Sequence, residues 1–269
     1  MLKLDQVCVS FRSERQDRIF GHTRQQVLFD VSFEVKKGTC LGVLGESGSG
    51  KSTMGRVLCG LLKPDSGEVV LDGISVYDSR KGRRNLQNKL SVVFQDYTTS
   101  ANPRFRIFDV IREGLRVRQR REKVRLNEEL EVRKLLELVG LPADAAQRFP
   151  HQLSGGQLQR VCIARAVACS PEIILFDEAI SSLDAHTQVQ IMDLLRELKD
   201  KLGLTYIFIT HDLTSVTYLC DEVLFLYQGR VTEHLPVEKI GETADGYARR
   251  LLESIVVFDT EDDTEEAVI

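Results

Sequence analysis

The stretch TCLGVLGESGSGKS (39–52) decides the fold of this chain. Its first half is an almost unbroken apolar run, which predicts a strand buried on both faces of a parallel or mixed sheet. Its second half, GESGSGKS (45–52), fits the pattern G-x-x-x-x-G-K-[ST]. Glycines allow the backbone N–H groups of such a loop to surround an anion. A helix expected over 51–62 adds the positive end of its dipole.

This loop predicts binding of a nucleotide phosphate, with ATP and Mg²⁺ as the expected ligands. Lys51 is expected to reach the β and γ phosphates, and the Ser52 hydroxyl to bind Mg²⁺. The residues expected to contact the nucleotide are Gly45, Glu46, Ser47, Gly48, Ser49, Gly50, Lys51, Ser52 and Thr53. Kinases and GTPases share this loop, so it does not define the class of protein by itself.

The segments on both sides of the loop predict an α/β fold, because strand and helix patterns alternate. Strand patterns occur at 2–11, 27–35, 67–73, 90–96, 172–178, 205–211 and 222–230. Helical periodicity fills 104–168 with little strand signal, and a further helix is expected near 185–201. We expect a P-loop (RecA-like) core with a mixed sheet, an antiparallel β subdomain on its N-terminal side and an inserted α-helical subdomain.

A pair of carboxylates ends the apolar segment IILFDE (173–178). A strand of this kind delivers Asp177 to the rim of the sheet, beside the Mg²⁺ ion. Glu178 is expected to face the other way in the same strand and to act as the general base that polarises the attacking water.

The segment LSGGQ (153–157) is followed at once by the helical sequence LQRVCIARAVA, and kinases and GTPases do not carry it. It resembles the signature of ABC ATPases. Ser154, Gly155 and Gly156 are expected to open a helix and form a second anion site, with Gln157 beside it. The resemblance implies that this site closes over the γ-phosphate bound to a partner subunit, so hydrolysis requires a dimer.

The resemblance also assigns roles to single residues outside these motifs. Phe11 corresponds to the aromatic residue that stacks on adenine. Gln95 matches the glutamine that senses Mg²⁺ and water, so it joins the catalytic set with Glu178 and His211, and the metal ligands with Ser52 and Asp177. His211 matches the switch histidine that contacts the γ-phosphate. The loop Ser182, Leu183 and Asp184 matches the loop that communicates across the dimer.

The same resemblance divides the chain into three parts. These are the ATPase core at 1–95 and 165–230, the helical subdomain at 96–164, and a C-terminal extension at 231–269. The polar stretch 12–26 is expected to be a surface loop, and the acidic tail after Phe258 is expected to be disordered.

Composition agrees with a peripheral protein on the cytoplasmic face of a membrane. Of 269 residues, 42% are apolar and 28% charged, and no apolar run is long enough to span a bilayer. The N-terminus lacks a signal-peptide pattern. A net charge of −4 gives no reason to expect nucleic acid. The scattered cysteines are expected to be small buried thiols: Cys8, Cys40, Cys59, Cys162, Cys169 and Cys220.

Finer similarities lie in VVFQDYTTSANPR (92–104), LSGGQLQRVCIARA (153–166) and the insertion after Phe11. They resemble the peptide/nickel importer family, and its nickel-importing branch most closely. Peptide-importing members usually carry His-Pro-Tyr-Thr where this chain has DGYA (245–248). The resemblance implies a second ABC ATPase subunit (different or identical), two permease subunits and a solute-binding protein, with nickel or a related metal or metal chelate as cargo.

Three other functions remain as alternatives. One is a dipeptide or oligopeptide importer. A second is a soluble ABC ATPase of DNA repair or translation, although such proteins usually carry two cassettes or a long coiled coil, and this chain has one cassette and no sustained heptads. A third is a P-loop small-molecule kinase, against which LSGGQ and the following SSLD (181–184) argue.

Overall fold

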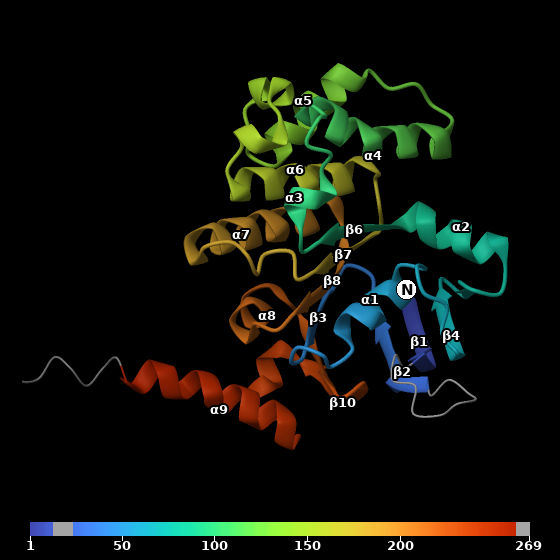
Figure 1. Ribbon diagram of the computed structural model, residues 1–269, viewed down its shortest axis with the longest axis vertical. Coiled ribbons are helices and arrows are strands. Elements are labelled where there is room, and N and C mark those ends of the chain that lie inside the picture. Colours follow the sequence, from blue (N-terminus) through green and yellow to red (C-terminus); the bar gives the residue numbers. More distant parts are fainter. Residues whose placement is uncertain (13–23, 262–269) are drawn as a thin grey trace, which may run out of the picture.

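The computed structural model describes residues 1–12 and 24–261 (Figure 1). Its larger sheet has six strands in the order β10-β9-β3-β8-β7-β6, which run parallel except for the antiparallel edge strand β10. The strands are β3 (Cys40–Leu44), β6 (Leu90–Phe94), β7 (Ile173–Asp177), β8 (Thr205–Thr210), β9 (Glu222–Tyr227) and β10 (Arg230–Pro236). The expected mixed sheet with a parallel centre is confirmed.

The smaller sheet is antiparallel, with the order β2-β1-β4-β5. Its strands are β1 (Leu2–Arg12), β2 (Arg24–Val35), β4 (Ser66–Leu71) and β5 (Ile74–Ser75). Helix α1 (Lys51–Leu58) lies between the two sheets, because Met54 of α1, Leu4 of β1 and Ile209 of β8 belong to one buried apolar cluster. The small sheet therefore holds the helix that follows the glycine-rich loop against the core.

The helical part lies at the top of Figure 1. It consists of α3 (Tyr97–Ser100), α4 (Ile107–Glu122), α5 (Glu128–Leu138), the 3₁₀ helices η1 (Ala143–Gln147) and η2 (Pro150–Gln152), and α6 (Gly155–Ala168). Helix α6 is buried on most sides, and a Cβ on Gly114 of α4 would lie 2.3 Å from the carbonyl oxygen of Arg165. This close packing fixes the position of the N-terminus of α6.

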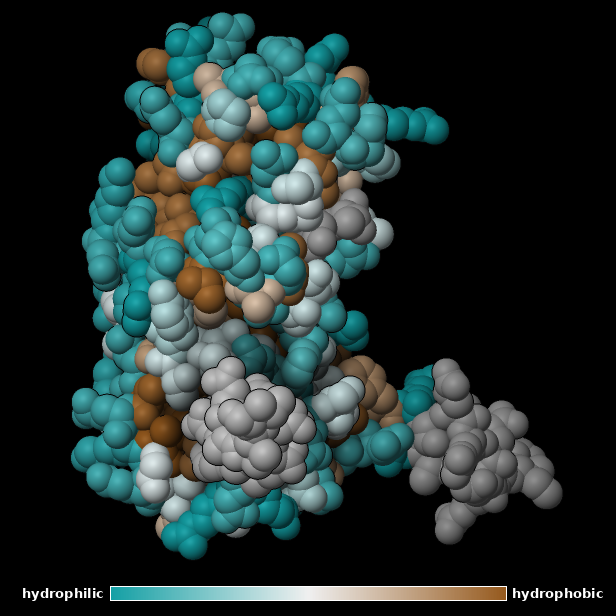
Figure 2. Space-filling model, turned by 90° about the vertical axis from the view of Figure 1, so that its left-hand side faces the viewer, coloured by the Kyte–Doolittle hydropathy of each residue, from teal (hydrophilic) through white to brown (hydrophobic). Residues whose placement is uncertain are grey.

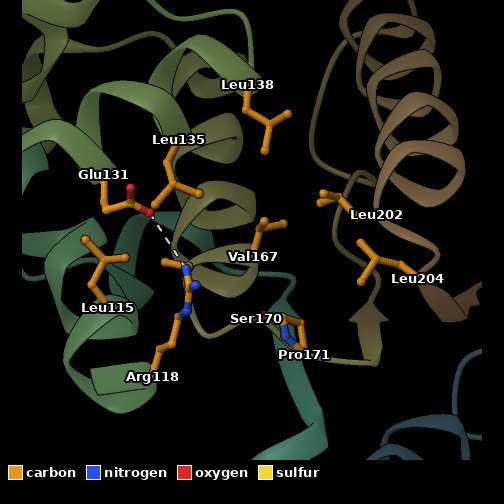
Figure 3. A pocket seen from close by; sticks show the side chains of 11 residues that line it. Leu115, Arg118, Glu131, Leu135, Leu138, Val167, Ser170, Pro171, Leu202 and Leu204 are labelled. Atoms are coloured by element: carbon orange, nitrogen blue, oxygen red, sulfur yellow. Dashed lines mark ion pairs between the residues drawn. The ribbon is translucent and has the colours of Figure 1, made fainter. Parts of the chain in front are cut away.

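The boundary between the helical part and α7 (Ala185–Leu202) contains an apolar pocket (Figure 3). Leu135 lies on one side of it, and Leu202 and Leu204 lie on the other. An ion pair between Arg118 and Glu131, with an N–O distance of 3.7 Å, joins α4 to α5 beside these leucines. Figure 2 shows that apolar side chains also gather on the upper half of one face, over the helical part. Because of the pocket, side chains do not completely fill the boundary between the helical part and α7.

Helix α2 (Arg80–Lys89) has no counterpart among the sequence predictions. Only Gly82 and Leu86 of this polar helix are buried, so the sequence has no apolar period there. Ser79 caps the helix by accepting a hydrogen bond from the Gly82 N–H at 3.0 Å.

Several predicted boundaries move. Helix α1 ends at Leu58 instead of 62, since Gly60 turns the chain with a φ of +73°. Strand β2 already begins at Arg24, which leaves residues 13–23 of the expected loop outside the described residues. Helix α6, in contrast, ends at Ala168, where the predicted helical segment 104–168 ends.

The chain also continues the core past residue 230, because β10 pairs with β9 along its length. The remaining elements are α8 (Leu213–Leu219), the 3₁₀ helix η3 (Val237–Glu242) and α9 (Gly246–Glu261). Helix α9 includes the start of the acidic tail, and residues 262–269 lie outside the described residues. In the part that the structure describes, no helix is both long enough and apolar enough to cross a membrane.

Candidate active site

The loop between β3 and α1 has a conformation that requires glycine. Gly48 and Gly50 have φ angles of +81° and +105°, in the left-handed region that side chains disfavour. At Gly45 the limit is space, because a Cβ would lie 2.3 Å from the carbonyl oxygen of Leu226. The loop is therefore folded tightly against the core, directly before the first turn of α1.

The side chain of Lys51 lies beneath this loop and is only 4% exposed. Its Nζ donates hydrogen bonds to the carbonyl oxygens of Gly45 at 2.6 Å and Glu46 at 2.8 Å. Burial lowers the pKa of Lys51, and the negative charges of Glu178 and Asp177 oppose this effect. The ammonium is thus held by neutral carbonyls, which a bound phosphate group would replace with stronger, charge-assisted partners.

The carboxylate of Asp177, at the end of β7, faces α1, since a Cβ on Gly55 would lie 4.0 Å from its Oδ2. Its Oδ1 is buried and has no hydrogen-bond partner among the described residues. Burial raises the pKa of Asp177, the charge of Glu178 raises it further, and Arg56 and Lys51 oppose both. A buried carboxylate oxygen without a partner is the kind of ligand that Mg²⁺ accepts.

Two other oxygen-bearing side chains come to the same edge of the sheet. Ser52 is exposed in the first turn of α1. Gln95 directly follows β6, whose Phe94 pairs in register with Asp177. A hydroxyl, an amide and a carboxylate with water and phosphate oxygens form the hard-ligand set of Mg²⁺, so these residues fit that ion.

Glu178 stands at a strained turn and not in a strand. Strand β7 ends at Asp177, and Glu178 has a φ of +48° while its N–H donates to the carbonyl oxygen of Ile209 at 2.9 Å. The expectation that Glu178 belongs to the strand was therefore wrong, because the strand ends one residue earlier. Its Oε2 lies 3.7 Å from Nδ1 of His211, which follows β8. Strained non-glycine residues of this kind concentrate at functional sites.

The LSGGQ segment forms the N-terminus of α6. The Ser154 hydroxyl accepts a hydrogen bond from the Gln157 N–H at 3.3 Å, and the Gln157 amide oxygen accepts one from the Ser154 N–H at 3.1 Å. This capping box gives Gln157 a structural role in the free chain. A Cβ on Gly156 would lie 2.5 Å from Cγ2 of Thr187, in the first turn of α7. Asp184 caps that helix by accepting a hydrogen bond from the Thr187 N–H.

The aromatic ring expected to stack on adenine is available on the small sheet. Phe11 is 38% exposed on β1, opposite Gln25 of β2. Strand β2 then passes the loop, where the carbonyl oxygen of Val27 would lie 3.2 Å from a Cβ on Gly50. The structure therefore places Phe11 on the strand next to the one that borders the loop.

Sequence reasoning missed two residues at this site. The backbone N–H of Glu46 donates to the hydroxyl of Tyr247, on α9, at 2.9 Å. Arg56 of α1 contributes positive charge beside Asp177. No local pattern marks Tyr247, because its link to the loop spans 201 residues. For Arg56, the only signal in the sequence was its position on the helix predicted over 51–62.

The phosphate-binding loop after β3, the carboxylates at the end of β7 and the histidine after β8 lie at one edge of the sheet, and a glycine-opened helix carries the signature segment; this is the arrangement of an ATP-hydrolysing cassette. The family model described as ABC transporter matches residues 28–181, more than half of the chain. The chain belongs to the ABC transporter family. It is an ATP-binding subunit of an ABC importer and an ATPase coupled to transport.

Two curated relatives illustrate the range of this group. The metal-staphylopine import system ATP-binding protein CntF of Staphylococcus aureus (strain Mu50 / ATCC 700699) is 40% identical over 260 residues, which cover 96% of this chain and 100% of that protein. The oligopeptide transport ATP-binding protein OppF of Bacillus subtilis (strain 168) is 42% identical over 234 residues, covering 86% of this chain and 76% of that protein.

Solved cassettes share the fold. A dimeric post-hydrolysis state of the cassette MJ0796, bound to ADP and Pi, superposes with a TM-score of 0.74 at 31% identity, covering 88% of this chain and 99% of that one. The cassette cbiO1 from Clostridium perfringens, part of the ABC transporter complex cbiONQ, gives 0.74 at 28% identity, with 90% of each chain covered.

Proposed function

We propose that this chain hydrolyses MgATP at the edge of its large sheet, in a site that a second ABC ATPase subunit completes. The observation that carries this proposal is the approach of Glu178 Oε2 to His211 Nδ1, at 3.7 Å, beside the buried Lys51. It supports the assignment of Glu178 as base, His211 as γ-phosphate contact and Lys51 as phosphate-binding cation, because hydrolysis of a phosphoanhydride requires such groups to lie close together.

In this proposal adenine stacks on Phe11, while the loop N–H groups and Lys51 hold the β and γ phosphates. Glu178 accepts a proton from a water molecule as the water oxygen attacks the γ phosphorus. The bond from the γ phosphorus to the β–γ bridging oxygen breaks, and ADP and phosphate leave. His211 donates to a γ-phosphate oxygen and keeps the water aligned with Glu178.

Ser52, Gln95 and Asp177 are the residues that would hold Mg²⁺. When bound, this ion supplies positive charge to the oxygens of the β and γ phosphates. Oδ1 of Asp177, which has no hydrogen-bond partner within residues 1–12 and 24–261, supports the assignment, because such an atom is costly to bury unless a ligand satisfies it in the working state.

Asp177→Asn is expected to raise the Tm of the nucleotide-free protein at pH 8 by up to about 3 °C, while it impairs Mg²⁺-dependent hydrolysis. Folding raises the pKa of Asp177, so stability falls as pH rises from the unfolded-state pKa through the folded-state pKa, and stays lower above it. Asparagine removes the charge that causes this loss. Thermal unfolding and ATPase assays measure both effects, and a lower Tm of the nucleotide-free variant at pH 8 would contradict the assignment.

The site requires a second subunit in this proposal, because the signature helix α6 lies in the helical part and α1 lies below it in the core (Figure 1). We propose that each chain offers its α6 N-terminus to the γ-phosphate held by its partner. That partner is a second ABC ATPase, different from this chain or identical to it. The dimeric state of the MJ0796 cassette supports this arrangement.

Two permease subunits and a solute-binding protein complete the proposed transporter, with this chain peripheral on the cytoplasmic face of the membrane. Leu61 is 67% exposed and Phe94 is 43% exposed, and both line one cleft with Arg56 and Cys59. Exposed apolar side chains around a cleft are typical of an interaction surface. We propose the side of this cleft formed by Leu61 and Phe94 as the permease contact, while Asp177, which also lines the cleft, belongs to the proposed Mg²⁺ site.

For the cargo we propose nickel, or a related metal or metal chelate. The match to the metal-staphylopine importer subunit covers the whole of that protein, whereas the match to the oligopeptide subunit covers 76% of it. The DGYA sequence at 245–248, in place of the His-Pro-Tyr-Thr of peptide importers, supports the same choice.

Deletion of this subunit is expected to abolish high-affinity uptake of radiolabelled nickel and to lower nickel-dependent enzyme activity, both restored by excess external nickel. Uptake of a labelled dipeptide serves as the matched measurement in the same strain. Unchanged nickel uptake together with lost dipeptide uptake would assign the importer to peptides, and a deletion that leaves both unchanged would contradict the proposed cargo.

A further inference from the structure

The C-terminal part of the chain reaches the phosphate-binding loop through one side chain. Tyr247, in the first turn of α9, is 4% exposed. Its hydroxyl oxygen accepts a hydrogen bond from the backbone N–H of Glu46 at 2.9 Å. Its ring stacks on Tyr227 of β9, with centroids 4.4 Å apart and an interplanar angle of 28°. Burial raises the pKa of the Tyr247 phenol.

The position of Tyr247 is set by contacts with the core. Asp245 caps α9 by accepting hydrogen bonds from the Tyr247 N–H at 3.1 Å and the Ala248 N–H at 2.9 Å. The hydroxyl of Thr232, on β10, donates to the same Asp245 oxygen at 3.0 Å. Since β10 belongs to the large sheet, the Tyr247 hydroxyl is anchored to the core independently of the loop that it contacts.

Glu46 is therefore held from both sides. Its N–H is bound by Tyr247, and its carbonyl oxygen accepts hydrogen bonds from the Ser49 N–H at 3.1 Å and from Lys51 Nζ at 2.8 Å. These last two bonds close the loop around the site expected to receive phosphate. Without the Tyr247 hydroxyl, the N–H of Glu46 loses its partner and the first half of the loop loses its fixed point.

We propose that Tyr247 is a positioning residue for the nucleotide site, through which the C-terminal segment sets the affinity for ATP. The inference rests on the proposed phosphate-binding role of the loop. A preformed loop binds its ligand more tightly because less conformational freedom is lost on binding. Tyr247 contacts neither phosphate nor the attacked phosphorus, so it acts on binding and not on the chemical step.

Tyr247→Phe in the full-length chain is expected to raise the Kd for ATP, and the KM of the ATPase reaction, about two- to tenfold, which is the effect of losing one neutral hydrogen bond. The kcat should change by less than about twofold, since Glu178 and His211 are untouched. Tyr227→Phe is the matched control, because it removes a hydroxyl from the same ring stack without affecting Glu46. The control should bind ATP like the wild type.

Hydrogen exchange of the Glu46 amide tests the contact without any substitution. In the nucleotide-free wild type this amide should exchange at least about tenfold more slowly than that of exposed Ser47, and the protection should disappear in Tyr247→Phe. Equal exchange of the two amides in the wild type would overturn the proposal. So would a KM increase in Tyr227→Phe equal to that in Tyr247→Phe.

Lys51→Ala separates failure of this inference from failure of the proposed function. If Lys51→Ala loses ATP binding while Tyr247→Phe binds normally, the loop holds ATP and the role of Tyr247 is wrong. If Lys51→Ala binds ATP as the wild type does, the phosphate-binding role of the loop is itself wrong, and the inference falls with it.

Discussion

Glu178→Gln is expected to bind ATP with wild-type affinity and to hydrolyse it at least about a hundredfold more slowly, which is the smaller end of the contribution of a positioned general base. The amide has nearly the shape of the carboxylate but cannot accept the proton of the attacking water. Because ATP is then bound and not consumed, the variant should accumulate as an ATP-bound closed dimer. Steady-state phosphate release and size-exclusion chromatography with MgATP measure the two effects.

The strained backbone of Glu178 makes the choice of control important. The φ of +48° and the hydrogen bond from its N–H to Ile209 are retained in any side-chain substitution that leaves the turn intact. Glu178→Asp is the matched control. It keeps the carboxylate but moves it away from the attacking water by one methylene length, so hydrolysis should fall less than in Glu178→Gln. Hydrolysis at close to the wild-type rate in Glu178→Gln would show that another group accepts the proton.

Gly155→Asp is expected to abolish ATP hydrolysis by the assembled transporter. The substitution puts a carboxylate at the N-terminus of α6, where the proposed site receives the γ-phosphate of the partner subunit, and two negative charges in contact repel strongly. Gly155 is a better position than Gly156, because a side chain on Gly156 would collide with Thr187. ATPase assays on the complete transporter measure the loss.

Gly155→Asn has nearly the same volume without the charge, so it separates repulsion from steric blocking. If repulsion dominates, the asparagine variant should retain substantially more activity than the aspartate variant. Full activity of Gly155→Asp in the assembled transporter would show that α6 does not face a phosphate group.

Much of the fold was predictable because its signals are local. The apolar run before Gly45 and the glycines after it determine β3 and the loop within a dozen residues. Helix α2 gave no signal because it buries only Gly82 and Leu86. Strand β10 gave no clear signal because it pairs with β9 on one edge only and alternates half-buried with exposed residues.

The residues of the candidate site also differ in how far the sequence predicts them: some follow from a local motif, and others depend on contacts with distant segments. Lys51, Asp177 and His211 stand where their motifs end strands or open helices, so their meeting follows from a parallel sheet. The direction of Glu178 depends on its bond to Ile209 of another strand, which no local pattern encodes. The contact of Tyr247 with Glu46 joins residues 201 positions apart and requires the complete fold.

In the proposed mechanism the ATP site is shared between two subunits, with Lys51 acting in its own chain and Gly155 acting on the partner. The most direct test is equilibrium binding of a fluorescent ATP analogue to the isolated monomeric chain, with wild type, Gly155→Asp and Lys51→Ala measured side by side. We expect wild-type affinity for Gly155→Asp and at least about tenfold weaker binding for Lys51→Ala, the loss expected for a charge-assisted contact. Equal losses of monomer affinity in both variants would contradict the proposed mechanism.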